Sequence, residues 1–60
     1  MTLDHFLRVR GITSRDFAKQ INVTIHAVNK WRRRARLPRI ETVKKIMQAT
    51  KGRVRPNDWY

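Results

Sequence analysis

The sequence contains no cysteine. It therefore has no disulfide and no thiolate zinc site, which agrees with a reducing compartment. Two histidines, His5 and His26, and four acidic residues form no ligand pattern. We expect neither a metal ion nor a cofactor.

Glycine and long apolar runs are also scarce. With only Gly11 and Gly52, the chain has no glycine-rich phosphate loop, and no serine stands with a histidine and an acid in a catalytic pattern, so we expect no enzyme and no catalytic residues. No apolar run approaches the ~20 residues of a membrane helix. The first ten residues lack the pattern of a signal peptide. We expect a cytoplasmic protein with no membrane partner.

The chain is short and poor in acidic residues. Sixty residues make one domain at most, and such a chain buries only about 60% of its unfolded surface. Fifteen Lys and Arg face four Asp and Glu, a formal net charge of +11. Residues 30–39 hold six of these cations and no acid. This localised charge favours nucleic acid as the partner, and an acidic membrane surface or an acidic protein remains the alternative.

Local signals predict a first helix over residues 2–10. Thr2 is a good amino-terminal cap, and Gly11 suits the left-handed position after a helix. Helical spacing puts three apolar side chains on one face: Leu3, Phe6 and Leu7.

Two further helices follow at close spacing. Thr13 is the expected cap of the first, with Ile12 and Phe17 at the positions of a hydrophobic staple. This helix buries Phe17, Ala18 and Ile21 and should end near Ile21, because Asn22 tolerates a left-handed turn. Thr24 caps the second, over residues 25–32, and Val23 and Val28 repeat the staple. The expected buried stripe of this helix is Ala27, Val28 and Trp31.

The remaining residues predict a loop, a helix and a tail. Residues 34–38 form a basic loop, and a helix runs from about Arg39 to Thr50 with Gly52 as its stop. The apolar face of that helix is Ile40, Val43, Ile46 and Met47. We expect a domain over residues 1–52 and an extended tail over 53–60. The terminal Trp59 and Tyr60 should pack on the chain's own core or on a partner subunit.

The stretch from Phe17 to Trp31 resembles the helix-turn-helix of the phage Cro and C1 repressors. In that 20-residue unit, aligned from Ser14, a small residue stands fifth, glycine ninth, and apolar residues tenth, fifteenth and eighteenth. The corresponding residues here are Ala18, Asn22, Val23, Val28 and Trp31. The one departure is Asn22, and asparagine is the next-best residue at positive φ.

A longer pattern is similar to the short Cro and YdaS-like regulators. Its elements are Ala27-Val28-Asn29-Lys30-Trp31, Leu37-Pro38, Thr50-Lys51-Gly52 and Val54-Arg55-Pro56-Asn57-Asp58-Trp59. The resemblance implies an all-α domain of four or five short helices, with the motif over residues 13–32. It also implies transcriptional control, often in a prophage or mobile element. Such a protein would associate with the nucleoid when bound to DNA.

In this architecture the second helix of the motif enters the major groove and the first crosses the backbone. The expected base-reading residues are Thr24, Ile25, His26, Asn29 and Lys30. The expected phosphate-binding residues are Ser14, Arg15, Lys19, Arg32, Arg33, Arg34, Arg36 and Arg39. Arg34 or Arg36 is also a candidate for a minor groove. The competing interpretation is that these side chains only form a solvated surface.

We therefore expect a sequence-specific regulator of double-stranded DNA, Cro-like and repressing by occupying an operator. A homodimer would bind a pseudo-palindromic site. One alternative is an architectural protein of low sequence specificity. Another is an antitoxin with a toxin partner, a description often given to YdaS-like proteins. RNA binding has less support, because the chain has no aromatic platform.

Overall fold

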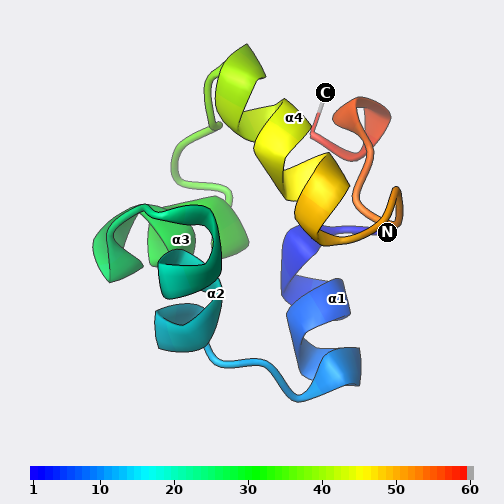
Figure 1. Ribbon diagram of the computed structural model, residues 1–60. Helices are drawn as coiled ribbons and strands as arrows, with labels where there is room; N and C mark the ends of the chain where they lie inside the picture. Colours follow the sequence, from blue (N-terminus) through cyan, green and yellow to red (C-terminus); the bar gives the residue numbers. More distant parts are fainter. Residues whose placement is uncertain (60) are drawn as a thin grey trace.

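Five short helices account for most of the computed structural model, which describes residues 1–59 (Figure 1). In chain order they are α1 (Leu3–Arg10), α2 (Ser14–Ile21), α3 (Ile25–Arg32), α4 (Ile40–Ala49) and the 3-10 helix η1 (Pro56–Asp58). The described residues contain no strand. The predicted all-α fold of four or five helices is confirmed.

A threonine caps the start of each of the first three helices. The hydroxyl oxygen of Thr2 accepts from the His5 backbone N–H at 3.2 Å. Thr13 and Thr24 do the same for Asp16 and Ala27, at 3.1 and 3.2 Å. Each bond satisfies an amide that has no partner within the helix. The three caps predicted from the sequence are confirmed.

The turn between α2 and α3 is tight because its first residue is left-handed. Asn22 has φ 60° and ψ 52°, and this conformation lets the Val23 N–H donate to the Ala18 carbonyl at 2.9 Å. Only Asn22, Val23 and Thr24 separate the two helices. Asn22 is thus the pivot that sets α3 across α2.

The core lies where the helices meet. α2 packs against α3 and α4, α1 against α3, and η1 against α4. The buried apolar side chains include the predicted aromatic residues Phe6, Phe17 and Trp31. The remainder are Leu3, Leu7, Ala18, Ile21, Val28, Val43, Ile46, Val54 and Trp59. Ile12 and Val23, the outer members of the two staples, are partly buried against this core.

The predicted apolar face of α4 is wrong at its first residue. Val43 and Ile46 are fully buried, but Ile40 is 63% exposed. Ile40 begins the helix, and that end of α4 extends beyond the other helices, so no element covers it (Figure 1). Met47, and Ala27 on α3, are partly rather than fully buried.

The chain after Gly52 differs from the predicted extended arm. Pro56 begins η1, a position its fixed φ suits, and the Asp58 carboxylate accepts from the Arg55 N–H at 2.8 Å. Val54 and Trp59 are 0% and 4% exposed, within the chain's own core. Two buried apolar side chains stabilise this turn where local propensity does not. The prediction for Tyr60 lies outside the described residues.

Thr50 connects α4 to this tail. Its buried hydroxyl donates to the Ile46 carbonyl at 2.8 Å and accepts from the Val54 N–H at 3.1 Å. The tail therefore leaves α4 at a fixed angle.

Within residues 1–59 no helix is long and apolar enough to cross a membrane.

Candidate nucleic-acid interface

The residues predicted to read bases lie on the outer face of α3 and at its start. All five are exposed: Thr24, Ile25, His26, Asn29 and Lys30. The inner face of the same helix is held by Val28 and Trp31, which are 0% and 7% exposed. The Thr24 oxygen already accepts from the Ala27 N–H, so its hydroxyl proton and one lone pair remain to contact another molecule.

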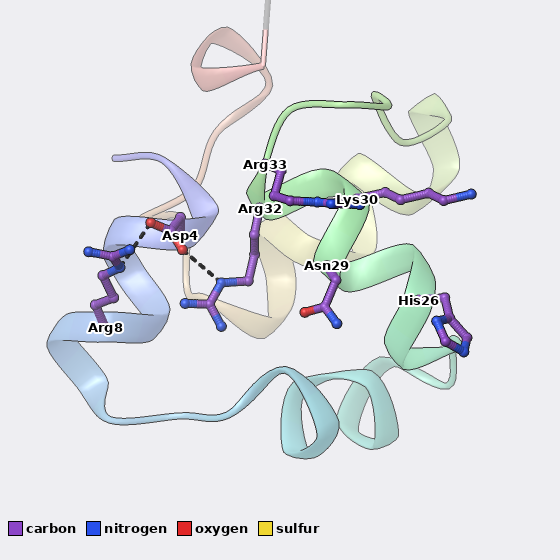
Figure 2. Close-up of a pocket in the computed structure, with 7 residues that line it drawn as sticks. All are labelled: Asp4, Arg8, His26, Asn29, Lys30, Arg32 and Arg33. Atoms are coloured by element: carbon purple, nitrogen blue, oxygen red, sulfur yellow. Dashed lines mark hydrogen bonds and ion pairs between the residues drawn. The ribbon is translucent and has the colours of Figure 1, made fainter.

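Two hollows border α3. The first, of about 460 Å³, separates α3 from α1 and is lined by Asp4, Arg8, His26, Asn29, Lys30, Arg32 and Arg33 (Figure 2). The second, of about 430 Å³, lies between α3 and the start of α4, and its lining includes Arg36, Leu37, Pro38 and Arg39. His26 and Lys30 line both hollows. These two side chains therefore stand on a ridge between two basic depressions.

Most of the predicted phosphate-binding cations are exposed, and three of them border this ridge. Arg33 lines the first hollow, and Arg36 and Arg39 line the second. Arg15 and Lys19 are exposed on α2, the helix that precedes α3. The structure thus brings three of the predicted cations, Arg33, Arg36 and Arg39, to the hollows beside α3.

Two of the predicted phosphate-binding residues, Arg32 and Ser14, instead bond to each other. Arg32, the last residue of α3, donates from Nη1 to the Ser14 hydroxyl at 2.9 Å and from Nε to the Asp4 carboxylate at 2.8 Å. Its side chain is only 22% exposed. A guanidinium has five N–H donors, so three remain beyond these two bonds.

Asp4 is the shared partner of two arginines. Its other oxygen lies 3.0 Å from Nε of Arg8, one turn further along α1 (Figure 2). The hydrogen bond from Arg32 lowers the pKa of Asp4 most, partial burial opposes it, and the charges of Arg32 and Arg8 add to the lowering. Asp4 is therefore a carboxylate that remains ionised at neutral pH beside the exposed face of α3.

Arg34 has a conformation that its residue type disfavours. It has φ 59°, and its Nη2 donates to the Trp59 carbonyl at 3.1 Å. The Arg34 and Ala35 amides donate back to the Trp31 and Lys30 carbonyls and close the end of α3. The basic loop is thus attached to the tail at its beginning.

The acidic residues are distributed unevenly. All four lie in the first turn of a helix: Asp4 in α1, Asp16 in α2, Glu41 in α4 and Asp58 in η1. α3 has no acid in its first turn. The positive end of its dipole is therefore not offset by a local carboxylate, which favours an approaching polyanion.

Comparison with known families decides what kind of domain this is. A family model for the Cro/C1-type HTH (helix-turn-helix) DNA-binding domain matches residues 2–55. The chain belongs to this family. No curated protein and no solved structure gives a significant match. The predicted resemblance is confirmed, and the protein is a double-stranded DNA-binding domain.

In this Cro/C1-type domain, α2, the turn and α3 form the helix-turn-helix. The replacement of glycine by Asn22 leaves the turn intact, since Asn22 has the left-handed φ of 60° that the ninth position of the motif requires. Ala18, at the fifth position, is 4% exposed. Its small side chain allows α3 to cross α2 closely.

Sequence reasoning missed two residues at this interface, Asp4 and Arg8. Asp4 suits the first turn of a helix, where the dipole favours an anion, and no local pattern distinguishes Arg8 from the other cations. Nothing local indicates that Asp4 meets Arg32, because 28 positions separate them.

Within residues 1–59 no three His, Cys, Asp or Glu side chains are grouped to hold a metal ion.

Proposed function

We propose that this Cro/C1-type domain is a sequence-specific regulator of transcription that represses by occupying an operator. α3 reads base edges in the major groove, and cations between Arg32 and Arg39 bind backbone phosphates. The observation that carries the proposal is the exposed ridge of α3, where Asn29, Lys30 and His26 border one or both basic hollows.

The exposed side chains of α3 differ in what they can read. Asn29 can bond adenine with both amide atoms, and Lys30 can donate to O6 or N7 of guanine. Ile25, 37% exposed, offers an apolar contact to a thymine methyl group. Thr24 and His26 add hydroxyl and ring N–H donors at the start of the helix. Such a mixed set discriminates bases, which a uniformly cationic helix does not.

The arginines on either side supply affinity without sequence preference. Arg33, Arg36 and Arg39 are exposed and line the hollows beside α3, and Arg15 and Lys19 are exposed on α2. Arg32 contributes through its remaining donors, and Arg34 or Arg36 of the basic loop would enter an adjacent minor groove. Ser14 has a hydroxyl proton to donate, since its oxygen accepts from Arg32.

The tests of this proposal are selection and quantitative binding. Sequences bound by the protein are selected from random duplexes, and dissociation constants are then measured on the enriched site and on random DNA at physiological salt. A specificity ratio of about 10³ or more is expected of a specific regulator. A lower ratio, or no enriched sequence, would instead indicate a low-specificity architectural protein.

The symmetry of the selected site tests the mode of assembly. A homodimer would give two inverted half-sites with centres ~34 Å apart, one turn of the duplex. A single asymmetric site would show that one copy binds alone. A reporter gene placed under the selected site then shows whether occupancy represses transcription.

A further inference from the structure

Three side chains from three helices meet beside the exposed face of α3. Asp4 comes from α1, Ser14 is the first residue of α2, and Arg32 is the last of α3. The two donor atoms of Arg32 lie 2.8 and 2.9 Å from their acceptors. In Figure 2 the Arg32 side chain points toward Asp4, and His26 lies near the opposite end of α3.

These bonds hold the end of α3 that the turn does not hold. The start of α3 is positioned by the left-handed Asn22 and the Thr24 cap. The opposite end is positioned by the Arg32 guanidinium, which bonds to α1 through Asp4 and to α2 through Ser14. Charged hydrogen bonds in one plane restrict both distance and direction. The network therefore restricts the rotation of α3 about its axis and its tilt against α1.

We propose that Asp4 is a specificity-determining positioning residue: through Arg32 it sets the orientation in which α3 presents Asn29 and Lys30. The inference rests on the proposed function, because it concerns how well that helix reads bases. Arg32 then acts chiefly on protein groups rather than on phosphate.

Charge alone predicts the opposite effect for Asp4. A carboxylate that lines the same hollow as Lys30 and Arg33 repels DNA, whatever the base sequence. Its removal should strengthen binding to every duplex if electrostatics is its only influence. A positioning role predicts weaker binding to the correct site. The two accounts therefore differ in sign.

Arg8 does not provide an equivalent link. Its side chain is 74% exposed, and it lies on the same helix as Asp4, so its ion pair connects no second helix. Exposed pairs of this kind contribute little. The link between helices thus depends on Asp4, Arg32 and Ser14.

The decisive comparison is between Asp4→Ala and Asp16→Ala. Both remove one negative charge from the first turn of a helix, but among the described residues Asp16 has no ion pair. Dissociation constants are measured on the selected site and on random duplex, under conditions where circular dichroism shows both variants folded. Asp4→Ala should lower the ratio of specific to random affinity about five- to tenfold. Asp16→Ala should leave that ratio unchanged.

Equal strengthening of both complexes by the two substitutions would overturn the proposal. Arg32→Lys supplies the second arm, because it keeps the charge but loses the planar fork of donors that joins Asp4 to Ser14. Arg32→Lys should lower the ratio of specific to random affinity as Asp4→Ala does. The variant with both substitutions should have a ratio no lower than that of either single variant. Additive losses would instead show that Arg32 and Asp4 act independently.

A measurement without DNA separates this inference from the proposed function. Backbone amide NMR shifts of residues 25–30 should change in Asp4→Ala and stay unchanged in Asp16→Ala. Unchanged shifts in both would overturn the positioning role even if a specific site exists. If selection yields no specific site, the proposed function fails, and the proposal that Asp4 sets specificity falls with it. Shifts seen in Asp4→Ala would then show only that Asp4 orients the helix.

Discussion

Arg34 and Trp59 are joined by a bond from the arginine Nη2 to the tryptophan carbonyl, 3.1 Å long. The bond attaches the basic loop to the tail across 25 positions of sequence. It forms while Arg34 holds φ 59°, a conformation that costs a side-chain-bearing residue about 1 kcal/mol more than glycine. Position 34 therefore combines a backbone that favours glycine with a side chain that glycine lacks.

Two substitutions at Arg34 separate these effects. Arg34→Gly and Arg34→Ala both remove the bond to Trp59, but only glycine relieves the backbone. Arg34→Ala should therefore be less stable than Arg34→Gly by about 1 kcal/mol. Urea unfolding followed by far-ultraviolet circular dichroism gives both free energies. Equal stabilities would show that the left-handed conformation at position 34 is not retained in solution.

The hydroxyl of Thr50 is expected to stabilise the tail. Thr50→Val keeps the shape but leaves the buried Val54 N–H without its acceptor. The free energy of unfolding should fall by about 1–3 kcal/mol, the cost of an unsatisfied buried group. Thr50→Ser retains the oxygen and is the control, with a smaller loss from the missing methyl group. A valine variant as stable as the serine variant would contradict the role of this bond.

Acid should destabilise the protein through Asp58 as well as Asp4. The hydrogen bond from the Arg55 amide, followed by the bond from the amino-terminal ammonium of Met1, lowers the pKa of Asp58. A carboxyl whose pKa is lower folded than unfolded stabilises the fold above its unfolded pKa, about 4. That contribution is lost as the pH falls through the lower, folded value.

Unfolding free energies measured from pH 6 to pH 2 test this sign. They should decrease below about pH 4 in the natural protein, and less steeply in Asp58→Asn. Asp16→Asn removes a carboxylate that has no ion pair among the described residues, and it serves as the control. A profile of Asp58→Asn parallel to that of the natural protein would refute the assignment.

Base reading and phosphate binding should respond differently to mutation. Asn29→Ala should cost about 1–3 kcal/mol at one base position and relax selectivity there. Arg33→Ala should weaken binding to all sequences alike and reduce the salt slope by about 1. Affinities on the selected site, its single-base variants and random duplex distinguish the two. Equal losses for Asn29→Ala on specific and random DNA would exclude it as a reader.

Local signals predicted the ends of the helices well. The caps at Thr2, Thr13 and Thr24 and the left-handed Asn22 act within a few residues, so their structural consequence can be inferred from neighbouring positions. α4 was predicted to within a residue at each end, with Arg39 and Thr50 as its flanking caps.

Long-range contacts were not predictable in this way. The aspartate at position 4 suits a helix start by itself, so nothing in the sequence requires Arg32 to meet it. The tail likewise looks extended when taken alone, because the burial of Trp59 depends on a surface built by distant helices. Ile40 fits the apolar periodicity of α4. It is exposed because the core does not extend as far as the start of that helix.

The burial of Val54 and Trp59 has a consequence for synthesis and turnover. The core includes side chains at positions 3 and 59, so it cannot be completed until residue 59 has left the ribosome. A product ending near Gly52 would still contain each of the proposed DNA-contacting residues. It would nevertheless lack two buried side chains in a domain with little stability to spare, and proteases act on unfolded chains. A stop codon near position 52 would thus act by lowering the amount of protein in the cell.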